Sequence, residues 1–326
     1  MNWRSKALLQ YALSAVPGGE RVNYLFQRYL TKSLPSSQSE FLATIRLAKL
    51  HIDAVRQHCD RRLEETTFYE FGAGWEMTIP LAFYAAGVEH QIVVDIRNLL
   101  RPMLVNNTIE KYQRMASDSV FLRIPERHVD GRRHQFQTKL KECYGIDYRA
   151  PCDAKLTGIE TNSIDVITST STLEHIPFRS LQLILRECHR ILRDDGLVSF
   201  IIDYTDHYSY FDSSISRYNY LKYSDAQWAL FNNGLHFQNR LRHCDYLDLF
   251  RAAGFEVVDE QHPEATDTEM KAIARLPLAK KFECYALHEL AVSFSLTLIR
   301  KAKHLDREIA DTTVDDTLVS EQRGAQ

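Results

Sequence analysis

The chain of 326 residues lacks the features that mark several large classes of protein. Its six cysteines include no C-x-x-C pair, which argues against a structural zinc site and against a redox dithiol. Its 40 basic and 43 acidic side chains form no block of one sign, so nucleic-acid binding driven by counterion release is not expected. No run approaches the ~18 apolar residues that a membrane span needs. We therefore expect a cytoplasmic globular protein with no metal, no nucleic-acid partner and no membrane span.

The chain does contain an alternation of short β-rich runs with helical periodicity, which is typical of parallel β-α units. The runs that predict strands are 66–71, 91–96, 144–150, 163–170, 197–203, 255–260 and 290–299. The segments with a helical pattern between them are 78–87, 178–192 and 245–254. The alternation predicts an α/β fold, a doubly wound sheet that is covered on both faces.

The segments outside this alternation suggest a division of the chain. Residues 1–62 show helical periodicity without strand signals, and we expect them to form an N-terminal helical cap. Residues 63–304 hold the sheet, with 204–243 as an inserted lid rich in Tyr, His, Asn and Arg. Residues 305–326 are polar and are predicted to be a disordered tail.

The first predicted strand ends in a glycine turn, Glu70-Phe71-Gly72-Ala73-Gly74. A backbone that turns sharply and touches a ligand needs glycine, because a Cβ would obstruct the approach. A carboxylate then follows each of the next two strands: Asp95 could accept hydrogen bonds from two ribose hydroxyls, and Asp153 could accept one from an adenine amine. Together with Glu70 just before the glycines, these residues predict a nucleoside lying across the carboxyl ends of the first three strands.

With these motifs the chain resembles the class I S-adenosylmethionine-dependent methyltransferases, and among them the methyltransferase type 11 domain group. The resemblance runs from about Thr66 to Lys301 and rests on EFGAG, the acid in VVDI, CDA, TSTLEHIP, and the final AGFEVV and LAVSFSLTLIRK. It implies a seven-stranded Rossmann-like sheet that ends in an antiparallel strand pair. It also implies that S-adenosylmethionine is the cofactor and that Gly72 and Gly74 face its methionyl part. In this sequence Glu76 replaces the family's frequent third glycine.

The resemblance implies further roles around the same site. Asp95 would bind the ribose and Asp153 the adenine, while Thr170 and Glu174-His175 would line the floor.

Two other functions stay open at this point. An NAD(P)-dependent oxidoreductase uses the same glycine turn and the same ribose acid, and Tyr218 and Lys222 have the spacing of a Tyr-x-x-x-Lys pair. Glu70 and the LEHIP segment favour the methyl donor instead. The third possibility is a scaffold that binds S-adenosylmethionine without turnover.

The predicted reaction is methylation of a small molecule, on the oxygen of a hydroxyl-rich acceptor such as a sugar or glycan precursor. Such a reaction needs a base, and Asp206-His207 is the first candidate because it lies just past the fifth strand, with His175 as a second. The alternative is that Asp206 caps a turn and His207 lies on the surface. Five residues of the lid are predicted to bind the acceptor, unless they only pack the lid onto the domain: Tyr208, Tyr210, Asn239, Arg240 and Arg242.

Overall fold

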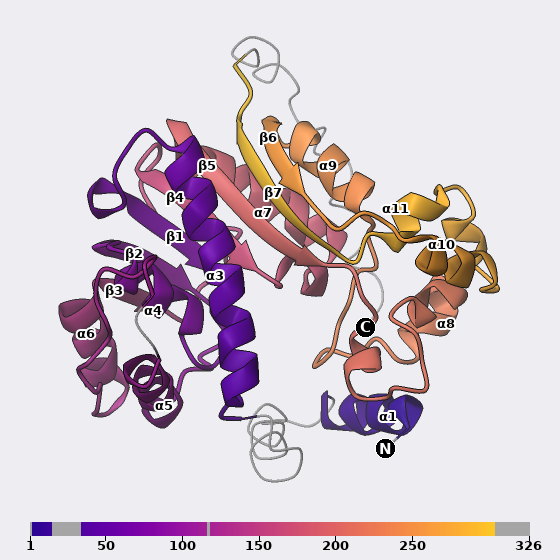
Figure 1. Ribbon diagram of the computed structural model, residues 1–326, viewed down its shortest axis with the longest axis horizontal. Coiled ribbons are helices and arrows are strands. Elements are labelled where there is room, and N and C mark those ends of the chain that lie inside the picture. Colours follow the sequence, from indigo (N-terminus) through magenta and orange to yellow (C-terminus); the bar gives the residue numbers. More distant parts are fainter. Residues whose placement is uncertain (1, 15–33, 116–117, 304–326) are drawn as a thin grey trace, which may run out of the picture.

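The computed structural model describes residues 2–14, 34–115 and 118–303. Its centre is a seven-stranded sheet in the order β3-β2-β1-β4-β5-β7-β6 (Figure 1). The strands are β1 Thr67–Phe71, β2 His90–Val94, β3 Ile146–Arg149, β4 Ile164–Thr170, β5 Leu192–Asp203, β6 Phe255–Gln261 and β7 Phe294–Lys301. All neighbouring strands are parallel except at β7, which runs antiparallel to both β5 and β6. The predicted fold class is therefore confirmed.

Helices cover both faces of the sheet, as a mainly parallel sheet requires. One face packs against α3 Gln38–His58, α4 Thr78–Ala85, α5 Pro102–Gln113 and α6 Arg133–Tyr144. The other face packs against α7 Phe178–Ile191 and α9 His243–Ala252. In the helical pattern predicted for 178–192, one side of α7 is buried at Leu181, Ile184, Leu185, Cys188 and Ile191. Phe178, the first residue of α7, is exposed. Each buried Leu or Ile of such a stripe contributes roughly 1.5–3 kcal/mol to the free energy of folding.

A third apolar cluster lies beyond the carboxyl edge of the sheet. We call this cluster the cap; it is not the same as the N-terminal helical cap predicted for residues 1–62. It combines α1 Trp3–Ser14, the insert with α8 Asp225–Ala229, and a segment between β6 and β7 that holds α10 Asp267–Ala274 and α11 Leu287–Ala291 (Figure 1). Its core is aromatic: the Trp3 ring contacts the rings of Tyr208, Tyr223 and Phe231. Short 3-10 turns complete the insert at His207–Tyr210 and Asn219–Lys222.

The helices described within residues 1–62, α1 and α3, therefore lie in different parts of the fold. Helix α1 belongs to the cap, whereas α3 lies along one face of the sheet near β4 and β5 (Figure 1). The segment 265–291, which the sequence pattern did not assign to the lid, also joins the cap. The strand predicted at 290–299 begins only at Phe294, because Leu287–Ala291 form α11.

Within the described residues no helix is both long and apolar enough to cross a bilayer. The expectation of a cytoplasmic protein stays a prediction. The predicted tail at 305–326 lies outside the described residues.

Candidate active site

A cavity of about 750 Å³ opens at the carboxyl ends of the central strands. We call it the cofactor pocket. The turns after β1, β2, β3 and β4 contribute Gly72, Gly74, Trp75, Asp95, Arg97, Cys152, Asp153, Lys155, Ser171 and Thr172. The loop before α7 adds His175, and the lid insert adds Gly234, Leu235 and Phe237. The edge where parallel strands end is the place where open α/β sheets bind their ligands.

The glycine turn after β1 is shaped by two different requirements. At Gly72 the backbone φ is +85°, and a Cβ would overlap the side chain of Thr172 from the turn after β4. At Gly74 φ is +68° and a Cβ would meet no atom within 4 Å. The first glycine therefore permits close packing between two turns, and the second leaves open space on the ligand side.

Asp95 and Asp153 meet at the cofactor pocket, as the sequence predicted. Asp95 is buried and accepts a hydrogen bond from the Arg97 amide at 3.0 Å. Asp153 accepts one from the Lys155 amide at 3.0 Å, and the Lys155 ammonium lies 3.1 Å from its other carboxylate oxygen. The Cys152 amide donates to the Asp95 carbonyl at 2.9 Å, which joins the turns after β2 and β3.

Three residues expected at the cofactor do not line this cavity. Glu70 is buried inside β1, where burial raises the pKa of its carboxyl to about 8. Ala73 packs against the core on the side of α3 and α4. Thr170 points toward α3 and lies 3.1 Å from the Nε2 atom of the buried His51, so Ser171 and Thr172 line the pocket in its place.

Glu76, which occupies the place of the third glycine, turns away from the cavity. Its carboxylate accepts a hydrogen bond from the Ser36 amide at 2.9 Å. Trp75 remains at the pocket wall.

Beside the cofactor pocket, the imidazole of His207 lies against the carboxylate of Asp203, with 3.2 Å between Nε2 and Oδ2. Asp203 is the last residue of β5, and the 3-10 turn at His207–Tyr210 folds the histidine back onto it. Burial alone would raise the pKa of Asp203, but the adjacent imidazole of His207 and hydrogen bonds from Thr205 and Tyr210 outweigh burial and lower it. The carboxylate is therefore ionised at neutral pH and orients the histidine.

The predicted partner of His207 is Asp206, and the structure gives this residue a different role. Its carboxylate accepts hydrogen bonds from the Tyr208 amide at 2.9 Å and from Asn219 Nδ2 at 2.8 Å. It thus caps the 3-10 turn. Burial raises the pKa of Asp206 to about 6.

Two more histidines and a glutamate surround His207. His175 lines the cofactor pocket, and its ring centroid lies 4.8 Å from that of His207. Burial lowers the pKa of His175 to about 4 and that of His236 to about 3, so both rings are neutral at pH 7. Glu174 is fully buried, and burial raises its pKa well above the usual value.

Donor atoms of Glu174, His175 and His207 all lie within 4.8 Å of one another, close enough to hold a cation. The same atoms can exchange a proton with a bound acceptor. Proton exchange is the use that fits this position, because the cluster borders the cofactor pocket.

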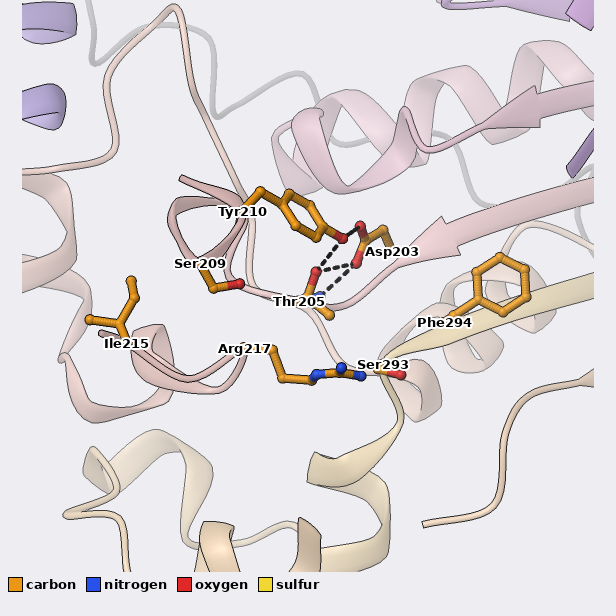
Figure 2. Close-up of a pocket in the computed structure, with 8 residues that line it drawn as sticks. All are labelled: Asp203, Thr205, Ser209, Tyr210, Ile215, Arg217, Ser293 and Phe294. Carbon is orange, nitrogen blue, oxygen red and sulfur yellow. Dashed lines mark hydrogen bonds between the residues drawn. The ribbon is translucent and has the colours of Figure 1, made fainter. Parts of the chain in front are cut away.

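A smaller polar cavity of about 420 Å³ lies beside Asp203 (Figure 2). It is lined by Asp203, Thr205, Ser209, Tyr210, Ile215, Arg217, Ser293 and Phe294. In Figure 2 the hydroxyl of Tyr210 reaches Asp203 and Thr205, while the guanidinium of Arg217 lies toward Ser293. We call this cavity the polar pocket. The sequence predicted Tyr210 as part of an acceptor site but did not indicate Asp203 or Arg217.

The other lid residues predicted to bind an acceptor have partners inside the protein. Tyr208 donates to the Phe231 carbonyl at 2.8 Å, and Asn239 donates to the carbonyls of Leu173 and Ile176 at 2.9 Å. These bonds tie the lid to itself and to the loop before α7.

Arg240 and Arg242, also predicted to bind an acceptor, are buried and have their partners inside the protein as well. Arg240 contacts the Tyr220 and Tyr223 carbonyls and Asp225. Arg242 is completely buried and donates to the carbonyls of Tyr204, Leu290 and Val292, and to the Tyr220 hydroxyl. These side chains hold the cap together. Their contacts agree with the alternative interpretation, in which the polar residues of the lid only pack it onto the domain.

Comparison with known families bears on what the cofactor pocket binds. The family model described as "Methyltransferase domain" matches residues 125–200, which include the turns after β3 and β4. Residues 125–200 therefore match a methyltransferase domain. The methyltransferase has no match among curated proteins.

Several solved structures are similar to the methyltransferase at low identity. Geranyl diphosphate C-methyltransferase from Streptomyces coelicolor A3(2) is 11% identical, with 83% of this chain and 88% of that chain covered at a TM-score of 0.44. The 1,6-didemethyltoxoflavin-N1-methyltransferase of Burkholderia thailandensis is 15% identical, with 87% of each chain covered and a TM-score of 0.46. A putative sarcosine dimethylglycine methyltransferase from Galdieria sulphuraria is 14% identical, with 80% and 86% covered and a TM-score of 0.43.

The structure removes the grounds for the oxidoreductase interpretation. Dinucleotide-binding sheets have the order 3-2-1-4-5-6, whereas here an antiparallel strand lies between β5 and β6. The pair Tyr218 and Lys222 does not line the cofactor pocket. The hydroxyl of Tyr218 instead donates to Glu269 at 3.1 Å within the cap.

The cofactor pocket fits S-adenosylmethionine on observations of its own. It has room for a nucleoside with an amino-acid tail, a carboxylate at the end of each of two neighbouring strands, and free space at Gly74.

Proposed function

We propose that this methyltransferase methylates an oxygen atom of a small hydroxyl-rich acceptor, such as a sugar or glycan precursor. The observation that carries the proposal is the 3.2 Å contact between His207 and Asp203, which lies between the cofactor pocket and the polar pocket. A neutral amine can attack through its lone pair and lose its proton afterwards, so it does not need such a base. A hydroxyl does, because its proton must leave as the new bond to carbon forms.

Residues of the cofactor pocket would hold S-adenosylmethionine in a fixed orientation. Asp95 would bind the ribose and Asp153 the adenine, with Gly72 and Gly74 beside the methionyl part. When bound, the cofactor supplies a methyl group on a sulfonium that is already activated for displacement. The task of the protein is therefore to align acceptor and donor, and such positioning contributes up to ~7–11 kcal/mol.

The His207–Asp203 pair determines which nitrogen acts as the base. Because Asp203 is ionised, its carboxylate 3.2 Å from Nε2 would favour the tautomer with the proton on Nε2 and the lone pair on Nδ1. Nδ1 would then be the atom that takes the proton of the acceptor hydroxyl during methyl transfer. The resulting imidazolium is stabilised by Asp203 and later loses its proton to water.

The residues that line the polar pocket favour an acceptor with hydroxyls and an anionic group. Ser209, Tyr210 and Ser293 offer hydroxyls at its wall. The guanidinium of Arg217 is about half exposed, and its ion-pair partner Glu269 lies 3.9 Å away. Arginine in such a position binds a phosphate or carboxylate in a fork.

A panel of acceptors tests the proposal by release of S-adenosylhomocysteine. Sugars, sugar phosphates and phenols represent oxygen acceptors, and primary amines and thiols serve as the comparison. The proposal predicts turnover with an oxygen acceptor that falls in the His207→Ala variant. Turnover only with amines or thiols would contradict it, and binding of the cofactor without turnover on any class would favour a scaffold.

A further inference from the structure

A second group of metal-binding side chains lies where α9 begins and β6 ends, outside the cofactor pocket and the polar pocket. Among the described residues, donor atoms of His243, Glu260 and His262 all lie within 4.8 Å of one another. His243 is the first residue of α9, Glu260 belongs to β6, and His262 directly follows that strand. The start of α9 and the end of β6 therefore bring three donors to the same point.

His243 has the surroundings of a metal ligand. Its side chain is 5% exposed, and its buried Nε2 atom has no hydrogen-bond partner among the described residues. Its other nitrogen, Nδ1, lies 3.1 Å from the hydroxyl of Tyr204, which in turn lies 2.8 Å from Ser295 Oγ. Metal-bound histidines are held by such a hydrogen bond to the second nitrogen, because it fixes the ring and its tautomer.

The other two side chains complete a set of the right size. Glu260 Oε2 lies 3.4 Å from His243 Nε2, and the rings of His243 and His262 are 5.2 Å apart. With metal–ligand distances of about 2.0–2.2 Å, two ligands of a tetrahedral ion lie about 3.3–3.5 Å apart. Glu260 and His262 are exposed, so their side chains can rotate to close the remaining gap.

We infer that His243, Glu260 and His262 bind a Zn²⁺ ion, with a water molecule in the fourth tetrahedral position. Two imidazoles and one carboxylate suit a borderline ion such as Zn²⁺, whereas Mg²⁺ and Ca²⁺ require ligands that are all oxygen. The absence of a C-x-x-C pair does not bear on this site, because its donors are histidine and glutamate.

The ion would join parts of the fold that are close to the active site. Tyr204, whose hydroxyl contacts His243, directly follows Asp203 in the chain and does not line the cofactor pocket. Bound Zn²⁺ would thus link the start of α9 and the end of β6 to the end of β5. The inference is independent of the proposed function, because it concerns a separate set of residues.

Titration of the full chain with Co²⁺ and Zn²⁺, after removal of metal with a chelator, tests the site. We expect Co²⁺ to give the visible absorption of a four-coordinate ion bound by nitrogen and oxygen, without a thiolate band, and Zn²⁺ to displace it at one equivalent. His262→Ala and Glu260→Gln change exposed side chains and should leave the fold intact. Each should weaken binding by at least the ~10–100-fold that loss of a supporting partner costs.

His128→Ala is the matched control, because His128 is an exposed histidine 4.0 Å from a single carboxylate, that of Glu110. It should bind Zn²⁺ as the unchanged chain does, and excess Mg²⁺ should not compete. Thermal unfolding gives a second readout: Zn²⁺ should raise Tm in the unchanged chain but not in His262→Ala. Equal affinity in the unchanged chain and in His262→Ala would overturn the inference, as would binding that is lost only in His175→Ala.

Discussion

His207 Nε2 lies 3.2 Å from Asp203 Oδ2, so the acid that orients the histidine is four residues before it. The neighbouring residue Asp206 cannot serve this purpose, since its carboxylate is used by Tyr208 and Asn219. This relationship links the end of β5 to the cluster beside the cofactor pocket. The effect expected from loss of the base depends on this contact between His207 and Asp203.

Removal of the base should affect turnover and not cofactor affinity. His207→Ala should lower kcat by about 10²–10⁴-fold, the usual contribution of general-base catalysis. Asp203→Asn should also lower kcat, because an amide no longer fixes the reactive tautomer. Steady-state kinetics together with calorimetry of S-adenosylmethionine binding measures both effects.

Asp206→Asn is the control for this pair. Its amide would oppose the donor Asn219, so we expect a lower Tm and, for the folded protein, a kcat close to that of the unchanged chain. Full activity in His207→Ala would remove His207 from the mechanism. A kcat that falls only in Asp206→Asn would restore the pairing expected from the sequence.

Asp95 gives a prediction for cofactor affinity. Asp95→Ala should weaken binding of S-adenosylmethionine by ~1–3 kcal/mol, because ribose hydroxyls would lose their acceptor. Asp248→Ala, which removes an exposed carboxylate of α9, should leave affinity unchanged. Calorimetry compares the two, and equal affinity in all three proteins would place the ribose elsewhere.

Arg217 gives a prediction for the acceptor. If it binds an anionic group of the acceptor in the ground state and the transition state alike, Arg217→Ala should raise KM with little change in kcat. The rise should be about tenfold or more, since hydrogen bonds to charged groups are worth ~1.5–3 kcal/mol. Arg275→Ala, an exposed arginine of the cap outside the polar pocket, is the control. An unchanged KM in Arg217→Ala would exclude Arg217 from acceptor binding.

The general features of the fold could be predicted because they follow from local pattern. Alternating strands and helices, with a glycine turn after β1, indicated the sheet and its ligand-binding edge. The sequence placed Asp95 and Asp153 at this edge because the loops that follow neighbouring parallel strands meet there, and both residues line the cofactor pocket.

The remaining features depend on tertiary packing, which a single sequence does not reveal. The contact of His207 with Asp203 needs the 3-10 turn that follows β5. Arg240 and Arg242 resemble ligand-binding arginines in sequence, but carbonyl groups of the cap surround them. The cap itself joins segments that lie far apart in the chain, so no local pattern could assign α1 to it.

Glu70 predicts how stability depends on pH. Burial raises its pKa to about 8 in the folded protein, from a usual value of 4.5. The folded state therefore binds the proton more tightly than the unfolded state, and this contribution to stability is lost as pH rises from about 4.5 through 8. In Glu70→Gln the free energy of unfolding should fall less over this interval.

Denaturant unfolding at a series of pH values measures this difference. Glu65→Gln, which changes an exposed carboxylate of the same region, should follow the unchanged chain. If Glu70→Gln shows the same pH dependence as the unchanged chain, Glu70 is not the group that titrates.

The most direct test of the central claim is a crystal structure of the protein with S-adenosylhomocysteine. The account predicts the adenosine in the 750 Å³ pocket, with its ribose hydroxyls at Asp95 and its adenine at Asp153. Electron density for the ligand at another place, or an empty pocket in crystals grown at saturating ligand, would contradict it.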